Sequence, residues 1–220
     1  RWAEAQPYLE KGYTLAAEIG QITHWLPAGD LVITFRMLKA TVFREQGAGD
    51  AALNCWLENI RDLEKSSLTP AMKGQLGYHY ETVAEMAFDG ENYPLSGEMA
   101  EKALRLYSQI LSNADFVKVQ TKLCRILAVS EAKNGRGEMA IQVAKKLFDV
   151  KYADFSDNSC GKTALEYSES TYLLAKVYRE AKEYGSAVVT YENGIKFSKT
   201  VVLMYSEVGD VNLENTVAAC

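Results

Sequence analysis

The chain has 220 residues, of which 48% are hydrophobic and 24% are charged, and its formal net charge is −5 at pH 7. This acidic balance argues against nucleic acid as a direct ligand, because binding to a phosphate backbone is driven by lysine and arginine. No apolar run reaches the roughly 18 residues that suggest a membrane-spanning helix, so we expect no membrane partner.

The four cysteines, Cys55, Cys124, Cys160 and Cys220, lie far apart and form no C-x-x-C pair. Their spacing therefore indicates neither a zinc site nor a disulfide framework. Cys55 and Cys124 fall within helical patterns, where cysteine is usually a small buried hydrophobic residue. This usage favours a reducing compartment, and we predict the cytoplasm, with the nucleus as the alternative.

Helical periodicity dominates, since apolar residues recur three or four positions apart and only four prolines interrupt them. In chain order, helices are predicted at 1–19, 30–46, 49–65, 70–88, 94–112, 115–134, 137–150, 163–182 and 185–199, with another beginning near 200–208. The segment 27–30 (Pro-Ala-Gly-Asp) predicts a break and then an N-cap aspartate. Thr69 and Pro70 predict an N-cap and a first helical position. Short turns within pairs are expected at 89–94 and 134–137.

The longest stretch without a helical pattern is 151–162. We expect a surface connector there, joining one helix pair to the next. A functional loop is the alternative, because binding residues are often found on loops.

A small-residue pattern recurs along the whole chain. The alanines of the first helix in each unit are Ala40, Ala84, Ala128 and Ala175, at steps of 44, 44 and 47. Such a fixed period is typical of a stacked array. We predict an all-α, superhelical array of antiparallel helix pairs, with about four full pairs and half-repeats at the ends. The second unit has two possible phases, because 97–100 (Gly-Glu-Met-Ala) resembles 137–140 and would shift it by four.

The last unit resembles the tetratricopeptide repeat (TPR) in its order of large, small and aromatic residues. The matching residues are Thr171, Leu174, Ala175, Tyr178, Ala187, Tyr191 and Gly194. Other units depart from the motif at Lys39, Glu131 and Ser96, and the period exceeds the usual 34 or so. HEAT repeats, at roughly 40–47 residues, are the structural alternative. The resemblance implies a TPR-like α-solenoid forming one domain over 1–220, and the half-unit at the start suggests a fragment of a larger protein.

Catalytic chemistry has little support in the sequence. Gly161-Lys162-Thr163 resembles the end of a P-loop, but Ser156 stands where the motif needs glycine and no strand precedes it. The two histidines, His24 and His79, have no recognisable catalytic partners. We therefore predict a protein that is not an enzyme and that uses no cofactor and no metal.

In the TPR family, the first helix of each pair lines a concave groove. The resemblance implies that partner-binding residues flank the small residue of that helix. They are Arg44, Tyr78, Glu81, Glu85, Lys122, Arg125, Tyr172, Lys176 and Arg179, with Thr34, Met37, Thr41, Phe88 and Val129 at further groove positions. Basic residues predominate in the last two units, so we expect an acidic segment or a peptide C-terminus with apolar neighbours. Thr41, Glu85 and Val129 replace the residues of the family's carboxylate clamp, which disfavours chaperone tails.

Two functions fit these sequence features. The first is a non-enzymatic scaffold that binds a peptide or helix of a partner protein in the groove. The alternative is a peptide- or ligand-sensing regulatory domain of a larger signalling or transcription regulator, in which the ligand shifts the array between two curvatures. A DNA-binding or nucleotide-binding module beside this region would favour the second function.

Overall fold

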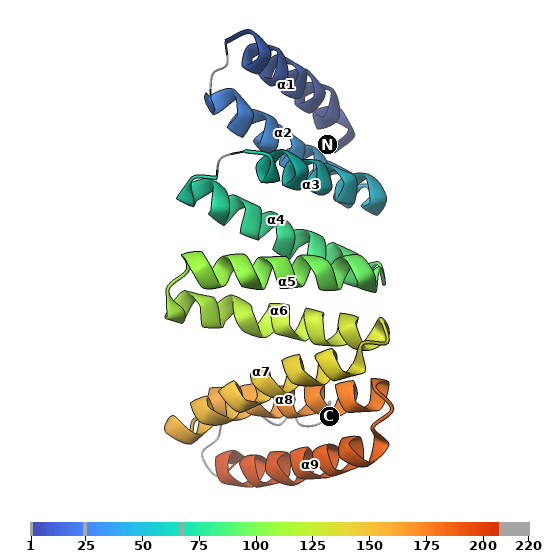
Figure 1. Cartoon of the computed structure of the whole chain (residues 1–220), viewed down its shortest axis with the longest axis vertical. Coiled ribbons are helices and arrows are strands. Elements are labelled where there is room, and N and C mark those ends of the chain that lie inside the picture. The colour runs from blue at the N-terminus through green and yellow to red at the C-terminus, as the bar shows by residue number, and fades with distance from the viewer. Residues whose placement is uncertain (1, 24–25, 67, 207–220) are drawn as a thin grey trace. The chain divides into compact units, whose positions relative to one another are not determined.

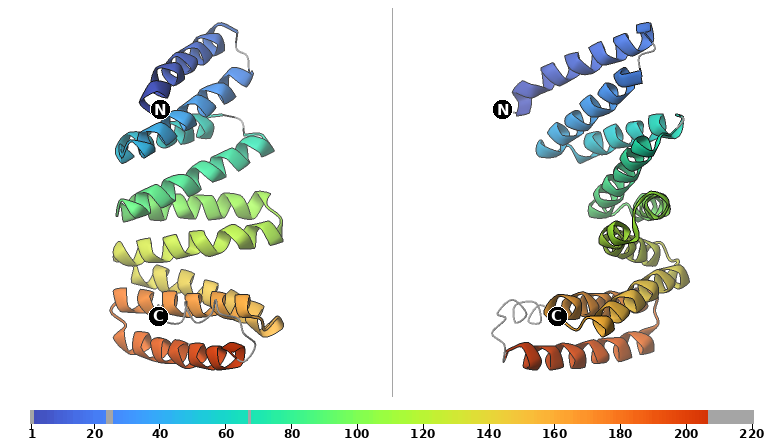
Figure 2. Two further views of the ribbon diagram at one scale, coloured as in Figure 1. Left: turned by 180° about the vertical axis from the view of Figure 1, so that it is seen from behind. Right: turned by 90° about the vertical axis from the view of Figure 1, so that its left-hand side faces the viewer.

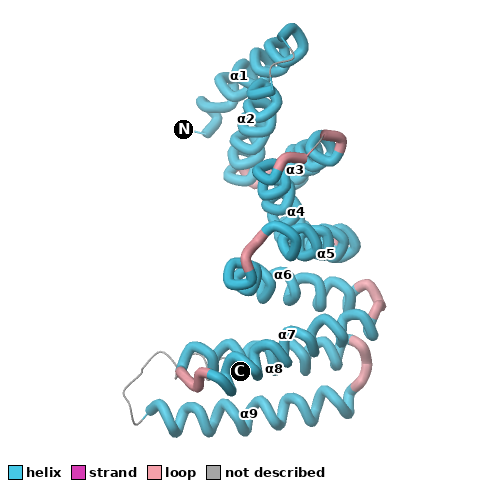
Figure 3. Tube along the Cα trace, turned by 60° about the vertical axis from the view of Figure 1, so that its left-hand side comes forward, coloured by secondary structure: helices cyan, strands magenta, loops and turns pink. Residues whose placement is uncertain are grey.

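The computed structural model describes residues 2–23, 26–66 and 68–206. Over these residues the secondary structure is entirely helical, with short connections (Figures 1 and 3). The helices are α1 (Trp2–Thr23), α2 (Leu26–Glu45), α3 (Gly49–Glu64), α4 (Pro70–Asp89), α5 (Tyr93–Ile110), α6 (Asn113–Lys133), α7 (Gly137–Asp157), α8 (Gly161–Glu180) and α9 (Tyr184–Ser206). The predicted all-α fold is confirmed.

The chain divides into two compact units, Arg1–Asn113 and Ala114–Cys220. In the first unit, each helix from α1 to α5 packs against the next and runs in the opposite direction (Figures 1 and 2). In the second unit, α8 packs between α7 and α9. The first helices of the four pairs are α2, α4, α6 and α8, and α1 is the opening half-repeat. The helix predicted to begin near 200 does not form, because α9 continues to Ser206.

The small residues that define the period are buried in the helix pairs. Ala40, Ala84, Ala128 and Ala175 are fully or almost fully buried. Twelve positions later, on the second helix of each pair, stand the similarly buried Ala52, Ser96, Ala140 and Ala187. Small side chains at both positions allow the two helices of a pair to approach closely while larger side chains fill the space around them.

The phase of the second pair is fixed by Ser96. Its hydroxyl donates a hydrogen bond of 2.9 Å to the carbonyl oxygen of Ala84 on the facing helix. Ser96 therefore occupies the position of the second-helix alanine, and its buried hydroxyl is satisfied. The pair is not shifted by four residues.

Every pair contains the same turn between its two helices. The residue seven positions after the first-helix alanine has a positive φ in each: Gly47 at 76°, Glu91 at 57°, Gly135 at 76° and Lys182 at 64°. The next amide donates to the carbonyl five residues earlier, as from Ala48 to Phe43 at 2.8 Å and from Glu183 to Tyr178 at 2.9 Å. This is the Schellman arrangement that closes a helix C-terminus. The turns predicted at 89–94 and 134–137 are confirmed.

Three predicted breaks between helices are misplaced. Helix α1, predicted to end at residue 19, continues to Thr23. The segment 27–30 lies inside α2, which begins at Leu26, because a proline in the first turn of a helix has no hydrogen bond to lose. The connector predicted at 151–162 is mostly helix, because α7 runs to Asp157 and α8 begins at Gly161. Thr69 and Pro70 act as predicted, since the Thr69 hydroxyl accepts from the amide of Met72 at 3.3 Å.

Tertiary contacts explain the extension of α7. Lys151 is buried, and its ammonium group donates to a Glu166 carboxylate oxygen of α8 at 2.7 Å. One turn later, the Phe155 ring stacks on Tyr167, with centroids 6.0 Å apart, and meets Phe197 edge to face at 5.1 Å. These contacts outweigh the weak helix preference of the polar residues that follow.

Glu131 replaces the aromatic residue of the motif in the third pair. Its side chain is buried, and its carboxylate accepts from the Arg136 guanidinium at 2.7 Å. Because Arg136 immediately precedes α7, this ion pair ties the turn to the end of α6. The departure from the motif is thus compensated within the same helix pair.

Candidate partner-binding surface

The predicted binding residues belong to the first-helix surface, meaning the side chains of α2, α4, α6 and α8 that flank the buried alanines. In the first unit its aromatic member is Tyr78, which is 49% exposed. The Tyr78 ring meets the Trp56 ring of α3 edge to face, with centroids 5.9 Å apart. Tyr78 therefore presents a supported aromatic face to solvent.

Glu81 and Glu85 lie one turn apart on α4 and are half-buried. The Tyr107 hydroxyl of α5 donates to a Glu81 carboxylate oxygen at 2.9 Å. Burial raises the pKa of Tyr107, and the hydrogen bond to Glu81 and the charge of Glu85 raise it further. The tyrosine therefore remains a neutral donor to Glu81, and Glu85 and Tyr78 lie close enough to act on it electrostatically, which makes this an acidic cluster.

The other predicted positions on α2 and α4 differ in how far their side chains are exposed. Arg44 is exposed in the last turn of α2, where the helix dipole by itself favours a cation. Thr34 is exposed, and Met37, Thr41 and Phe88 are half-buried. This part of the surface is less polar than the cluster around Glu81.

In the second unit the predicted basic residues lie on two first helices. Lys122 and Arg125 are on α6, Arg179 is exposed on α8, and Lys176 is half-buried. The prediction that Val129 faces the groove is wrong, because this residue is buried. Its apolar side chain, next to Ala128 in the sequence, is shielded from solvent instead.

Glu180 links the two first helices of this unit. Its carboxylate accepts from Lys133 of α6 and from Arg179, its neighbour on α8, both at 2.9 Å. These two hydrogen bonds lower the pKa of the Glu180 carboxyl. Part of the positive charge of Arg179 is therefore balanced, which sequence reasoning missed because Glu180 lies outside the predicted groove positions.

Lys133 and Glu180 stand at the same distance from their alanines, five residues after Ala128 and Ala175. Their direct contact means that α6 and α8 lie in register at this end. Residues at equal positions on the two helices, such as Arg125 and Tyr172, are expected to be neighbours on the surface.

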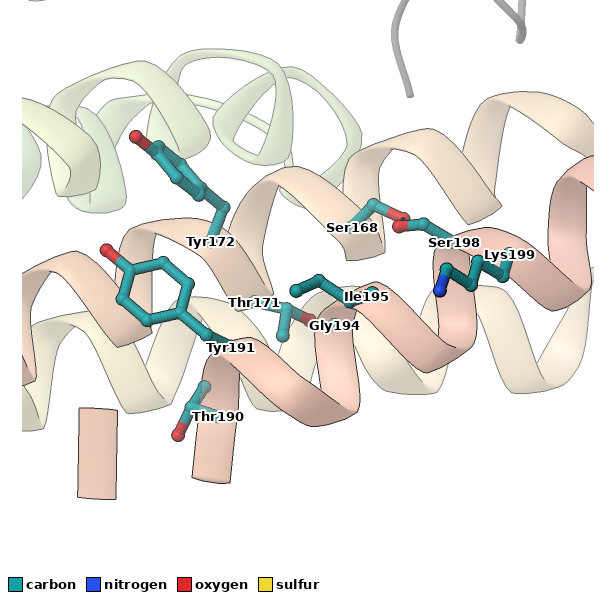
Figure 4. Close-up of a pocket in the computed structure, with 9 residues that line it drawn as sticks. All are labelled: Ser168, Thr171, Tyr172, Thr190, Tyr191, Gly194, Ile195, Ser198 and Lys199. Atoms are coloured by element: carbon teal, nitrogen blue, oxygen red, sulfur yellow. Dashed lines mark hydrogen bonds between the residues drawn. The ribbon is translucent and has the colours of Figure 1, made fainter. Parts of the chain in front are cut away.

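Tyr172 also borders a pocket between α8 and α9 (Figure 4). This α8–α9 groove has a volume of about 340 Å³ and is lined by Ser168, Thr171, Tyr172, Thr190, Tyr191, Gly194, Ile195, Ser198 and Lys199. The rings of Tyr172 and Tyr191 lie 5.9 Å apart on one side, and the Ser198 and Ser168 hydroxyls are 3.5 Å apart on the other. Of these residues the sequence predicts only Tyr172 as a binding residue, because Tyr191 and Gly194 match packing positions of the motif.

The remaining candidates for chemistry have structural roles. Helix α7 precedes Gly161, and Lys162 is exposed and 3.9 Å from a Glu166 carboxylate oxygen. The backbone amide of Cys160 donates to the Thr163 hydroxyl at 3.1 Å, which stabilises the start of α8. In the described part of the chain, no three His, Cys, Asp or Glu side chains are grouped to hold a metal ion.

Of the two histidines, His24 lies outside the described residues. His79 is buried against Trp56, with ring centroids 5.0 Å apart, and neither ring nitrogen has a hydrogen-bond partner among the described residues. Burial lowers the pKa of His79 to about 4, so the ring is neutral at pH 7.

Among the described helices, none is both long and apolar enough to cross a membrane.

No family model and no curated protein matches the sequence.

Solved structures do match. A point variant of the kinesin light chain-like TPR-like repeats from Podosopora anserina superposes with a TM-score of 0.59 at 12% identity, covering 92% of this chain and 98% of that one. A second structure of those repeats superposes with a TM-score of 0.59 at 13% identity, covering 88% of this chain and 96% of that one. BtubC (BKLC) from P. vanneervenii superposes with a TM-score of 0.52 at 12% identity, covering 99% of this chain and 88% of that one. The fold is therefore TPR-like, as the resemblance implied.

Proposed function

We propose that this protein is a non-enzymatic interaction scaffold whose first-helix surface binds an acidic segment of a partner protein. The register of α6 and α8 supports this, because the 2.9 Å contact between Lys133 and Glu180 joins equal positions of neighbouring first helices. A row of side chains from successive first helices can then contact one extended segment. A cytoplasmic location is part of the same proposal.

The chemistry of the second unit favours an acidic segment. Arg125 is exposed on α6, and Lys176 lies one residue after the buried alanine of α8. Tyr172, which is 48% exposed, adds an aromatic side chain of the kind that dominates interface energetics. A peptide with carboxylates and one apolar residue would pair with the cations and cover the tyrosine.

The test uses fluorescein-labelled ten-residue peptides rich in Asp and Leu, with a free C-terminal carboxylate, titrated against the full chain. The double variant Arg125→Glu, Lys176→Glu should weaken binding by at least about 2 kcal/mol, because two close charge pairs are lost and repulsion replaces them. Raising the salt concentration should weaken wild-type binding as well.

Lys146→Glu with Lys196→Glu is the matched control, because both side chains lie on second helices and the charge change is identical. This control should bind the peptides within about twofold of wild type at moderate ionic strength. Equal weakening in both double variants would mean that only net charge matters. That result would contradict a site on the first-helix surface.

A further inference from the structure

The α8–α9 groove differs in exposure from the equivalent groove of earlier pairs. Twenty positions after the first-helix alanine, Ile60 in the first pair is 3% exposed, whereas Ile195 in the last pair is 51% exposed. The position before Ile195 is Gly194, where a Cβ would meet the Thr171 side chain of α8 at 3.1 Å, so this glycine allows α9 to pack closely on α8. Among the described residues, the groove beside Ile195 is therefore much less covered than the one beside Ile60.

Within each unit, the first helix of the following pair packs on the second helix of the pair before it. In the first unit, α4 packs on α3 with His79 and Tyr78, whose rings lie edge to face on Trp56. The imidazole is the closer of the two, at 5.0 Å between centroids. In this unit, the packing helix places aromatic and imidazole rings against the second helix of the preceding pair.

The second unit repeats this arrangement with an added ion pair. Tyr167 of α8 packs on Phe148 and Tyr152 of α7, with centroids 5.3 and 5.5 Å apart. Next to Tyr167, Glu166 accepts from the buried Lys151 of α7 at 2.7 Å. This covering helix thus combines an aromatic side chain with an adjacent carboxylate.

We propose that the α8–α9 groove binds an amphipathic α-helix of a partner protein, seated as α8 is seated on α7. Its bulky apolar side chain would enter the groove of about 340 Å³ that Tyr191 and Ile195 line. A carboxylate on the same helix would pair with Lys199, which lines the groove, stands one position after Ser198, the equivalent of Lys151, and forms no ion pair among the described residues. This groove shares Tyr172 with the site of the proposed scaffold function, but neither Arg125 nor Lys176 lines it.

Helix α8 itself supplies a probe, because it is the covering helix of the preceding groove. A fluorescein-labelled peptide of residues 161–180 is titrated against the full chain, and saturable binding is expected. Ile195→Glu should lower the affinity at least about tenfold, since it places a charge in the apolar centre of the contact. Because Ile195 is half exposed in the free protein, this variant should remain folded.

Val189→Glu is the matched control, on the same helix with 55% exposure but outside the groove lining. It should bind the peptide within about twofold of wild type. A charge exchange tests the pairing of the carboxylate with Lys199. The peptide that carries Glu166→Lys should bind the wild-type chain at least about threefold more weakly than the unmodified peptide does. Its affinity should be restored when the full chain carries Lys199→Glu.

Absence of peptide binding, or equal binding by Ile195→Glu, would overturn the proposal. Self-association of the full chain that disappears in Ile195→Glu would assign the groove to a second copy instead. Binding that appears only after deletion of 207–220 would assign it to the chain's own last residues. The Arg125→Glu, Lys176→Glu variant should bind the helical peptide normally, so failure of the scaffold proposal is distinguishable from failure of this one.

Discussion

Acidification should destabilise the first unit through His79. This histidine is fully buried against Trp56, and neither ring nitrogen has a hydrogen-bond partner among the described residues. Burial lowers its pKa in the folded protein from 6.5 to about 4. Because the imidazolium would be desolvated and unpaired, the folded state resists protonation while the unfolded chain accepts it.

The sign and the size of the effect follow from this difference in pKa. Above pH 6.5 the ring is neutral in both states, so it has no effect on the pH dependence of stability. As the pH falls from 6.5 towards 4, the unfolded state binds a proton that the folded state does not, and the free energy of unfolding decreases. At about 1.4 kcal/mol per pKa unit the full loss is about 3 kcal/mol, and about 2 kcal/mol is lost by pH 5.

The measurement is urea denaturation of wild type and His79→Phe at pH 7 and pH 5, followed by circular dichroism and tryptophan fluorescence. Other groups titrate in both proteins, so their contribution cancels in the comparison. The phenylalanine variant should gain about 2 kcal/mol relative to wild type between the two pH values, whatever its stability at pH 7. If the two proteins lose stability in parallel, His79 is either solvated or hydrogen-bonded, and the reasoning is refuted.

Three further predictions concern packing, the turns and the thiols. Ala187→Glu should cost about 3 kcal/mol or more because it buries a charge at a close helix contact, whereas Val189→Glu, on the exposed side, should change the thermal midpoint little. Lys182→Gly should raise stability by about 0.5 kcal/mol, since a φ of 64° disfavours a residue with Cβ; an unchanged or lower midpoint would contradict this. Iodoacetamide should label Cys160 before Cys124, because hydrogen bonding to Thr163 lowers the pKa of the former and burial raises that of the latter to about 11. Peptide mass spectrometry would measure the order of labelling, and labelling of Cys124 first would contradict this prediction.

The sequence alone determined the fold class and the repeat period. Alanines at steps of 44, 44 and 47 are sufficient to predict an array of packed helix pairs, because helices can approach closely only where small side chains meet. Turn chemistry was also predictable where the local signal was strong, as at Thr69 and Gly135. These features depend on backbone preference and side-chain size, which are properties of a short stretch of chain.

Tertiary contacts decided what local sequence could not. Polar residues after 150 suggested a loop, but burial of Lys151 beside Glu166 and stacking of Phe155 extend α7 by about two turns. Exposure of the candidate site was equally undetermined, because a residue such as Ile195 belongs to a position that is buried elsewhere in the array. Whether such a residue is core or surface depends on whether another helix covers it, and that is a property of neighbours distant in the sequence rather than of the residue itself.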